Sequence, residues 1–146
     1  MRLLLVAVGK IKRPGLRAEL DLYLKRIRRY APCRELELKN GNARDIEERI
    51  RRLLPARSHT VVLDVKGQLW SSHELAGYLD RCRQGAVGTL VLLVGGADGL
   101  PASLVAAAQL RLSLSRLTLP HRLARVVLAE QLYRAFTIIH NEPYNH

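Results

Sequence analysis

The sequence has few aromatic residues, only two cysteines and no long apolar run. Aromatic side chains make up 5% of the 146 residues, although hydrophobic residues make up 48%, so the core must be aliphatic. No apolar run approaches the roughly 20 residues of a membrane-spanning helix, so we expect no such helix. Cys33 and Cys82 lack Cys-x-x-Cys or His-x-x-x-His spacing, so we expect reduced, buried thiols and no metal site.

We expect no export signal at the start of this sequence. The apolar start, Leu3–Val8, is short, and Gly9 and basic residues follow it without a small-residue cleavage site. This pattern favours a buried first strand over a signal peptide. We therefore expect a cytoplasmic protein.

Acidic residues are scarce, especially in the first part of the chain. Residues 1–57 contain sixteen Lys and Arg against seven Asp and Glu, whereas residues 58–146 contain eight against six. Nineteen of the 24 basic residues are Arg, whose planar guanidinium matches phosphate. The asymmetry favours a polyanionic partner such as RNA. The alternative is an arginine-rich solvated surface without a partner.

Apolar strands alternate with amphipathic helices, and no linker or repeat divides the chain, so we expect one domain over residues 1–146. The predicted strands are Leu3–Val8, Glu35–Lys39, Thr60–Val65, Thr89–Val94 and Ser113–Leu119. The predicted helices are Leu16–Arg29, Ala43–Leu54, Ser72–Arg83, Pro101–Leu110 and Arg122–Ile139.

Two of these strands are apolar without alternation, namely Val61–Val65 and Leu90–Val94. Such runs are typical of strands that are covered on both faces. Alternating strands and helices then predict a parallel, doubly wound α/β sheet. Ligands of such sheets bind beyond the carboxyl ends of the strands, which points to the loops Val65–Ser71 and Gly95–Leu100.

Two segments near those loops have the composition of a ligand site. Gly95, Gly96 and Gly99 follow a buried strand, where glycines let a ligand approach the backbone. They form neither a Gly-x-Gly-x-x-Gly motif nor a P-loop, and a tight turn without a ligand is equally consistent with them. Ser113, Ser115 and Thr118 alternate with leucines, and they line either a polar pocket or the wet face of an edge strand.

The last predicted helix carries polar residues on an otherwise apolar segment. His121 precedes this helix and either caps it or points into a site. Arg125, Glu130 and Arg134 interrupt the apolar pattern, and Glu130 and Arg134 have the favourable i,i+4 order. If that pair is exposed it contributes only a few tenths of a kcal/mol; if it is buried, binding is the best explanation. Tyr144 either stacks on a base or belongs to a disordered end.

Several of these segments together carry a family resemblance. They are Gly95-Gly96-Ala97-Asp98-Gly99, Ser113-Leu114-Ser115-Arg116-Leu117-Thr118-Leu119-Pro120-His121, Arg125-Val126-Val127-Leu128-Ala129-Glu130-Gln131-Leu132-Tyr133-Arg134-Ala135 and Pro143-Tyr144. They resemble the ribosomal large subunit pseudouridine methyltransferase H family, the smallest branch of the SPOUT methyltransferases. Leu5–Lys10 and Leu63-Asp64 with Gly67 are also similar to that family, so the resemblance covers the whole chain.

The resemblance implies an α/β/α sandwich with a parallel sheet and a deep trefoil knot. The knot and the cofactor site would lie within roughly 89–146, and the basic N-terminal half would bind RNA. It implies a homodimer that transfers a methyl group from S-adenosylmethionine to N3 of a pseudouridine in helix 69 of large-subunit rRNA, on assembled ribosomes. Cofactor contacts carried over by motif are Leu63, Gly95, Leu114, Ser115, Arg116, Leu117, Thr118 and Leu119. Asp98 is a further candidate, for the sulfonium or the ribose.

The resemblance also suggests residues for the reacting base and for RNA. His121, Arg134 and Tyr144 are the candidates near the base. Because the N-terminal half is strongly basic, the expected RNA contacts lie there, and they are Lys10, Lys12, Arg13, Arg17, Arg26, Arg28 and Arg29. The family usually ends Pro-Tyr-His followed by Lys or Arg, whereas this chain ends Pro143-Tyr144-Asn145-His146. The alternatives are a non-catalytic ribosome-associated RNA-binding protein and a SPOUT enzyme that acts on another RNA.

Overall fold

The chain alternates strands and helices from end to end, as the sequence predicts. The computed structural model describes residues 1–144. The strands are β1 (Arg2–Val8), β2 (Cys33–Leu38), β3 (Ser58–Leu69), β4 (Thr89–Val94) and β5 (Leu110–Ser113). The helices are α1 (Pro14–Ile27), α2 (Ala43–Leu53), α3 (Ser72–Gln84), α4 (Ala102–Ala107) and α5 (His121–Ile139).

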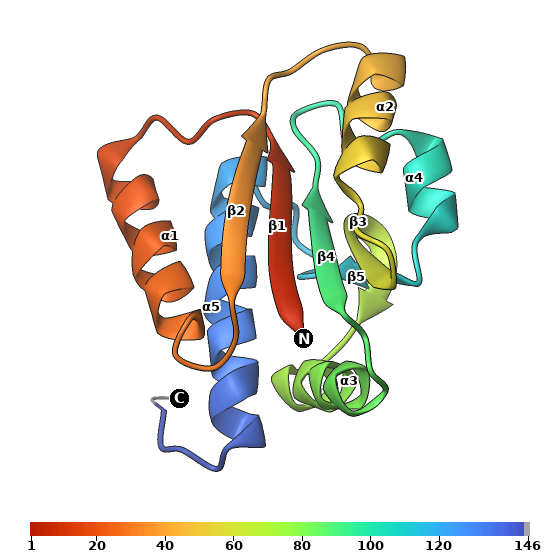
Figure 1. Ribbon diagram of the computed structural model, residues 1–146. Helices are drawn as coiled ribbons and strands as arrows, with labels where there is room; N and C mark the ends of the chain where they lie inside the picture. The colour runs from red at the N-terminus through yellow and green to blue at the C-terminus, as the bar shows by residue number, and fades with distance from the viewer. Residues whose placement is uncertain (145–146) are drawn as a thin grey trace.

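All five strands form one sheet in the order β2-β1-β4-β3-β5, and every neighbouring pair is parallel. Figure 1 shows α1, α3 and α5 on one face of this sheet and α2 and α4 on the other. Because parallel strands point the same way, their carboxyl ends meet at one edge. The predicted parallel, doubly wound α/β sheet is therefore confirmed.

Two hydrophobic clusters hold the layers together, one on each face of the sheet. Leu5 of β1 belongs to the cluster with Leu20 of α1 and Leu128 of α5. Its neighbour Val6 points the opposite way and belongs to the cluster with Ile50 of α2. Fully burying each such side chain contributes about 1.5–3 kcal/mol, so both helical layers are fixed mainly by aliphatic packing.

Side-chain caps fix where two of the helices begin. The predicted capping box is present at α3, where Ser71 Oγ accepts from the Glu74 amide and Glu74 Oε2 accepts from the Ser71 amide. At α2 the Asn42 side chain accepts from the Asp45 amide over 2.9 Å. Each cap satisfies backbone groups that a helix end leaves unpaired.

The prediction of a strand over Ser113–Leu119 is wrong, because β5 ends at Ser113. The helix predicted over Pro101–Leu110 is correspondingly shorter. Ser113 Oγ donates to the Ser115 carbonyl over 3.0 Å, and Ser115 Oγ accepts from the Leu117 amide over 2.9 Å. These local bonds replace a strand ladder and turn residues 114–120 into a loop.

β3 is longer than predicted because it pairs with β5 twice. The register shifts between Leu63 and Gln68, which marks a bulge. Gly67 lies in the bulged segment, and a Cβ there would come within 2.7 Å of the Arg111 carbonyl carbon. The bulge therefore requires glycine at this position, and it bends β3 just beyond Leu63.

Candidate functional site

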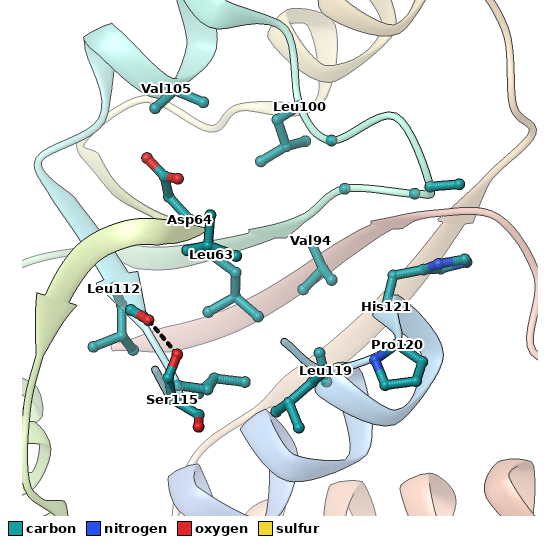
Figure 2. Close-up of a pocket in the computed structure, with 18 of the residues that line it drawn as sticks. Leu63, Asp64, Val94, Leu100, Val105, Leu112, Ser115, Leu119, Pro120 and His121 are labelled. Carbon is teal, nitrogen blue, oxygen red and sulfur yellow. Dashed lines mark hydrogen bonds between the residues drawn. The ribbon is translucent and has the colours of Figure 1, made fainter. Parts of the chain in front are cut away.

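A pocket opens at the carboxyl ends of β3, β4 and β5, where the fold predicts a ligand. Its volume is about 520 Å³, within the usual range for small-molecule and cofactor sites. The sides are formed by the end of β3, the loop after β4, the loop after β5 and the start of α5 (Figure 2). The walls are mostly aliphatic, with Leu63, Leu100 and Leu119 among them.

The turn after β4 brings backbone rather than side chains to the pocket. A Cβ on Gly95 would lie 2.7 Å from the carbonyl carbon of Gly99, so only glycine permits this close approach. Gly99 itself has a φ of 74°, in the left-handed region that favours glycine. Its amide donates to the Gly96 carbonyl over 3.0 Å, which closes the turn. Backbone polar groups are thus accessible beside an apolar wall.

The loop after β5 supplies the facing wall. Leu114, Ser115, Leu117 and Leu119 all line the pocket, and Leu117 is 78% exposed. The leucines that looked like one face of a strand are therefore the lining of a cavity. Ser113 and Ser115 lie in the lining of the pocket, whereas Thr118 does not. The loop's shape depends on these two serines, through the bonds described above.

His121 lies where the pocket meets the first turn of α5 (Figure 2). Partial burial and the nearby cations of Arg122 and Arg125 lower the pKa of His121 below its ordinary value of 6.5. The imidazole is therefore neutral at pH 7 and has a nitrogen that accepts a proton. The unpaired amides at this helix start add a weakly positive environment.

Asp64 is a pocket residue that has a family-like position in the sequence but no predicted role. It follows Leu63 at the point where β3 bends, and its side chain lines the pocket (Figure 2). Asp98, the sequence-based candidate for an acidic contact, is exposed and does not line the pocket. The signal that was available is the position of Asp64 at the carboxyl end of a buried strand.

These groups define the ligand chemistry that the pocket suits. Within residues 1–144, no lysine or arginine lines it. Phosphate-rich ligands therefore lack the cations that usually bind them. Aliphatic walls with accessible backbone groups suit a planar heterocycle, and a single carboxylate suits a cation or a hydroxyl group.

Most of the predicted cofactor contacts meet in this pocket, and some do not. Leu63, Gly95, Leu114, Ser115, Leu117 and Leu119 line it, together with the predicted catalytic residue His121. Arg116 and Thr118 are exposed and do not line it. Asn145 and His146, where the tail departs from the family pattern, lie outside the described residues.

Arg134 and Tyr144 form a second cluster around Glu130. Arg134 Nε donates to Glu130 Oε1 over 2.8 Å, and both side chains are about one-fifth exposed, at 22% and 18%. The Arg134 guanidinium carbon lies 4.5 Å from the centre of the Tyr144 ring, and Tyr133 meets that ring edge-on. Burial, a hydrogen bond with Tyr23 and the Glu130 carboxylate raise the pKa of Tyr144 to about 12, so its hydroxyl stays protonated at neutral pH.

This second cluster lies far from the pocket of the same chain. His121 and Arg134 are both on α5 and thirteen residues apart, which is about 20 Å along a helix that rises 1.5 Å per residue. Tyr144 packs against Arg134, so it belongs to the distant end as well. The structure of one chain therefore does not bring the three predicted catalytic residues together.

A buried ion network ties the start of α5 to β2 and to the loop after β1. Arg125 is 1% exposed, and its Nη1 lies 2.5 Å from Glu37 Oε2. Its Nη2 donates to the Gly9 carbonyl over 3.0 Å. Glu37 also accepts from the Ile11 amide over 2.9 Å. The network therefore joins the pocket end of α5 to the loop that carries Lys10, Lys12 and Arg13.

The seven predicted RNA contacts, which we name the basic surface, lie on α1 and on the segments directly before and after it. Lys10, Lys12 and Arg13 are exposed in the segment between β1 and α1. Arg28 and Arg29 are exposed at the far end of α1. Four members have contacts within the protein. Arg26 lies over the rings of Tyr23 and Tyr133, and Arg17 is paired with Asp21, Glu35 and Glu37. Arg28 Nε donates to the Cys33 carbonyl over 2.9 Å, and the Arg29 guanidinium carbon lies 5.9 Å from the centre of the Tyr30 ring.

Two further properties bear on the class of protein. Across residues 1–144, no helix has the length and apolarity to cross a membrane. The same part of the chain has no group of three or more His, Cys, Asp or Glu side chains placed to hold a metal ion. Cys33 and Cys82 are both free and buried, as expected from the sequence.

Comparison with known proteins gives consistent matches along the whole chain. A family model described as "Predicted SPOUT methyltransferase" matches residues 1–146. "Ribosomal RNA large subunit methyltransferase H" of Sorangium cellulosum is 45% identical over 146 residues, with 100% of both chains covered. Proteins with the same name from Geobacter sulfurreducens and Moorella thermoacetica are 41% and 40% identical over 158 residues, with 100% and 99% of each chain covered.

Proposed function

Because this chain belongs to the SPOUT methyltransferase family, we propose that it is an rRNA methyltransferase of the large ribosomal subunit. The proposed reaction transfers a methyl group from S-adenosylmethionine to N3 of a pseudouridine in helix 69, on assembled ribosomes. The proposal includes a cytoplasmic location and the family's deep trefoil knot within roughly 89–146. Its main structural support is the pocket formed by the glycine turn and the loop at residues 114–120.

The pocket residues fit the proposed cofactor. Leu63, Leu114 and Leu119 offer apolar surfaces for an adenine ring, and the backbone around Gly95 offers groups that hydrogen-bond to its edge. Shape and backbone dominate this recognition, so the exact side chains of the loop matter less than its path. When bound, the cofactor supplies a methyl group on a sulfonium with a good leaving group.

The target nitrogen carries a proton that must leave, and we assign to His121 the role of helping to place the base or of accepting that proton. Its neutral imidazole lies at the pocket, which is the protonation state that a general base requires. Arg134 has the complementary role of orienting the base through its carbonyl oxygens and favouring the imide anion. Tyr144 would then position the ring by stacking.

These roles need a second copy of the chain, because His121 and Arg134 are about 20 Å apart on one helix. A two-fold dimer can bring residues of one protomer to the pocket of its partner. We propose that the Glu130–Arg134–Tyr144 cluster of one protomer serves the pocket of the other. Analytical ultracentrifugation tests this step, and an active monomer would refute it.

The basic surface is proposed to bind the rRNA backbone. Arginine and lysine contacts to phosphate release counterions, so binding weakens as salt rises. A base in a stem-loop can leave its stack, and we propose that the target base is extruded into the pocket. Arg125, about one helical turn beyond the pocket residue His121, donates to the Gly9 carbonyl at the start of the loop that carries Lys10, Lys12 and Arg13.

The test uses ribosomes from a strain that lacks the corresponding gene, incubated with the purified protein and S-adenosylmethionine. Arg134→Ala should reduce turnover by about a hundredfold, as loss of a single charge-stabilising donor does in other enzymes. Its cofactor Kd should stay within about twofold of wild type. Arg83→Ala is the matched control, because Arg83 forms a helix-surface pair with Asp80.

The outcomes separate the three functions. Equal losses of turnover and cofactor binding in Arg134→Ala would overturn the role given to Arg134. Absence of calorimetric heat with S-adenosylmethionine would favour the non-catalytic RNA-binding protein. Methylation of another RNA, with large-subunit rRNA left unmodified, would favour a SPOUT enzyme that acts on that other RNA.

A further inference from the structure

The lining of the pocket carries a net charge that has no role in the proposed methyl transfer. Asp64 and His121 are the two ionisable side chains among its lining residues. Figure 2 shows them on opposite sides of the cavity. Because burial, Arg122 and Arg125 lower the pKa of His121, the imidazole is neutral at pH 7 and the lining has one net negative charge.

The Asp64 carboxylate is held in place by the local backbone. Its Oδ1 accepts a hydrogen bond from the Lys66 amide over 3.1 Å. The side chain is half-buried, and the bulge of β3 that Gly67 permits determines where it lies. Such an anchored carboxylate acts as a fixed charge, and partial burial screens its field less than open solvent does.

The two forms of the proposed cofactor differ by one charge. The methyl donor has a sulfonium, which is a permanent cation. The by-product left after transfer, S-adenosylhomocysteine, has a neutral thioether at the same position and is otherwise unchanged. A pocket with one fixed negative charge therefore interacts more favourably with the donor than with the by-product.

We propose that Asp64 makes this pocket select the sulfonium donor over its thioether by-product. This inference rests on the proposed function, because it takes S-adenosylmethionine as the ligand. Asp64 acts as a specificity determinant: it attracts the sulfonium of the donor, and this attraction is lost once the methyl group has left. The consequence is that fresh donor displaces the by-product at equal concentrations.

Isothermal titration calorimetry with three ligands tests the proposal. The ligands are S-adenosylmethionine, S-adenosylhomocysteine and sinefungin, an analogue with an amine cation near the sulfonium position. Wild type should bind both cations roughly tenfold more tightly than the thioether, because tenfold in Kd corresponds to about 1.4 kcal/mol, the order of one partly screened charge interaction.

Three variants separate charge from shape. Asp64→Asn keeps an oxygen that accepts from the Lys66 amide, and it should reduce the preference to within about twofold while leaving thioether binding nearly unchanged. Asp64→Glu keeps the charge and should retain most of the preference. Asp98→Asn is the matched control, because Asp98 is exposed outside the lining, and it should behave as wild type.

Several results would overturn the proposal. An unchanged preference in Asp64→Asn excludes the charge, and equal losses for all three ligands assign Asp64 to a group that they share. If Asp64→Asn fails to fold, wild type still decides, because thioether binding as tight as sulfonium binding refutes the selection without any variant. Failure of wild type to bind any of the three ligands instead removes the proposed function.

Discussion

Replacing Arg125 with methionine tests whether the buried ion network supports the pocket end of α5. Methionine keeps much of the length and apolar surface of the arginine stem but removes its charge. The change breaks the contacts of Arg125 with Glu37, Glu35 and Gly9. Two carboxylates that are only 19% and 11% exposed then lose a buried cation.

The loss of unfolding free energy depends on which cations remain beside Glu35 and Glu37. Breaking a buried ion pair by removing one member usually costs about 3–5 kcal/mol. Arg17 still lies 2.5 Å from Glu35 and 3.4 Å from Glu37, so we expect the lower end. A loss of about 3 kcal/mol corresponds to a fall in Tm of about 10 °C for a chain of this size.

Urea unfolding of the purified variant measures this loss, with the denaturant slope checked against wild type. Arg44→Met is the matched control, because Arg44 pairs with Glu48 at 3.6 Å while 87% exposed. Such a surface pair contributes little, and the control should stay within about 0.5 kcal/mol of wild type. An Arg125→Met variant as stable as this control would refute the reasoning.

Acid pH gives an independent check on the same network. Burial raises the pKa of Glu37, but hydrogen bonds from the Ile11 amide and Arg125 outweigh it and lower the pKa below 4.5. Glu37 therefore stabilises the fold fully above its unfolded pKa, and this contribution is lost as pH falls through the lowered folded value. Arg125→Met should lose less stability than wild type on acidification below pH 4.5. An identical acid limb would contradict this account.

Three further changes test other parts of the structure. Gly95→Ala should destabilise the fold by about 1–3 kcal/mol through overpacking, and it should abolish cofactor binding in calorimetry. Gly96→Ala is the control and should stay close to wild type in stability, because a Cβ at Gly96 would lie 3.5 Å from Val8. Equal stability of the two variants would contradict the packing argument. Arg122→Gln should raise the pKa of His121 in an NMR titration, since Arg122 is one cause of its lowering, and no rise would exclude that charge effect. Neutralising three basic-surface residues in the loop after β1 should reduce the slope of log affinity for ribosomes against log salt by about 2–3, and an unchanged slope would remove that loop from the RNA contact.

The architecture could be predicted because it depends on local pattern. Unbroken apolar runs such as Leu90–Val94 identify strands covered on both faces, and Ser71 with Glu74 marks a helix start. The alternation after Leu112 led to the wrong prediction of a strand over Ser113–Leu119, because leucines that line a cavity have the same period as leucines on one strand face. Strand and pocket lining differ only in backbone hydrogen bonds, which Ser113 and Ser115 redirect.

The site itself depends on contacts between distant segments. Arg125 stood out in its helix, but its partners Glu35 and Glu37 lie 90 and 88 residues away in sequence. No local pattern indicates that these three charges share one buried network. Asp64 was missed for a similar reason, because its place in the pocket depends on the bulge that β3 forms against β5.

Mass spectrometry of rRNA provides the most direct test of the central claim. Ribosomes from a strain without the gene are incubated with the wild-type protein and S-adenosylmethionine, and fragments containing the helix 69 loop are compared before and after. We expect a gain of one methyl group on a pseudouridine of that loop, dependent on the cofactor. Unmodified fragments, in the presence of a protein that binds both cofactor and ribosomes, would contradict it.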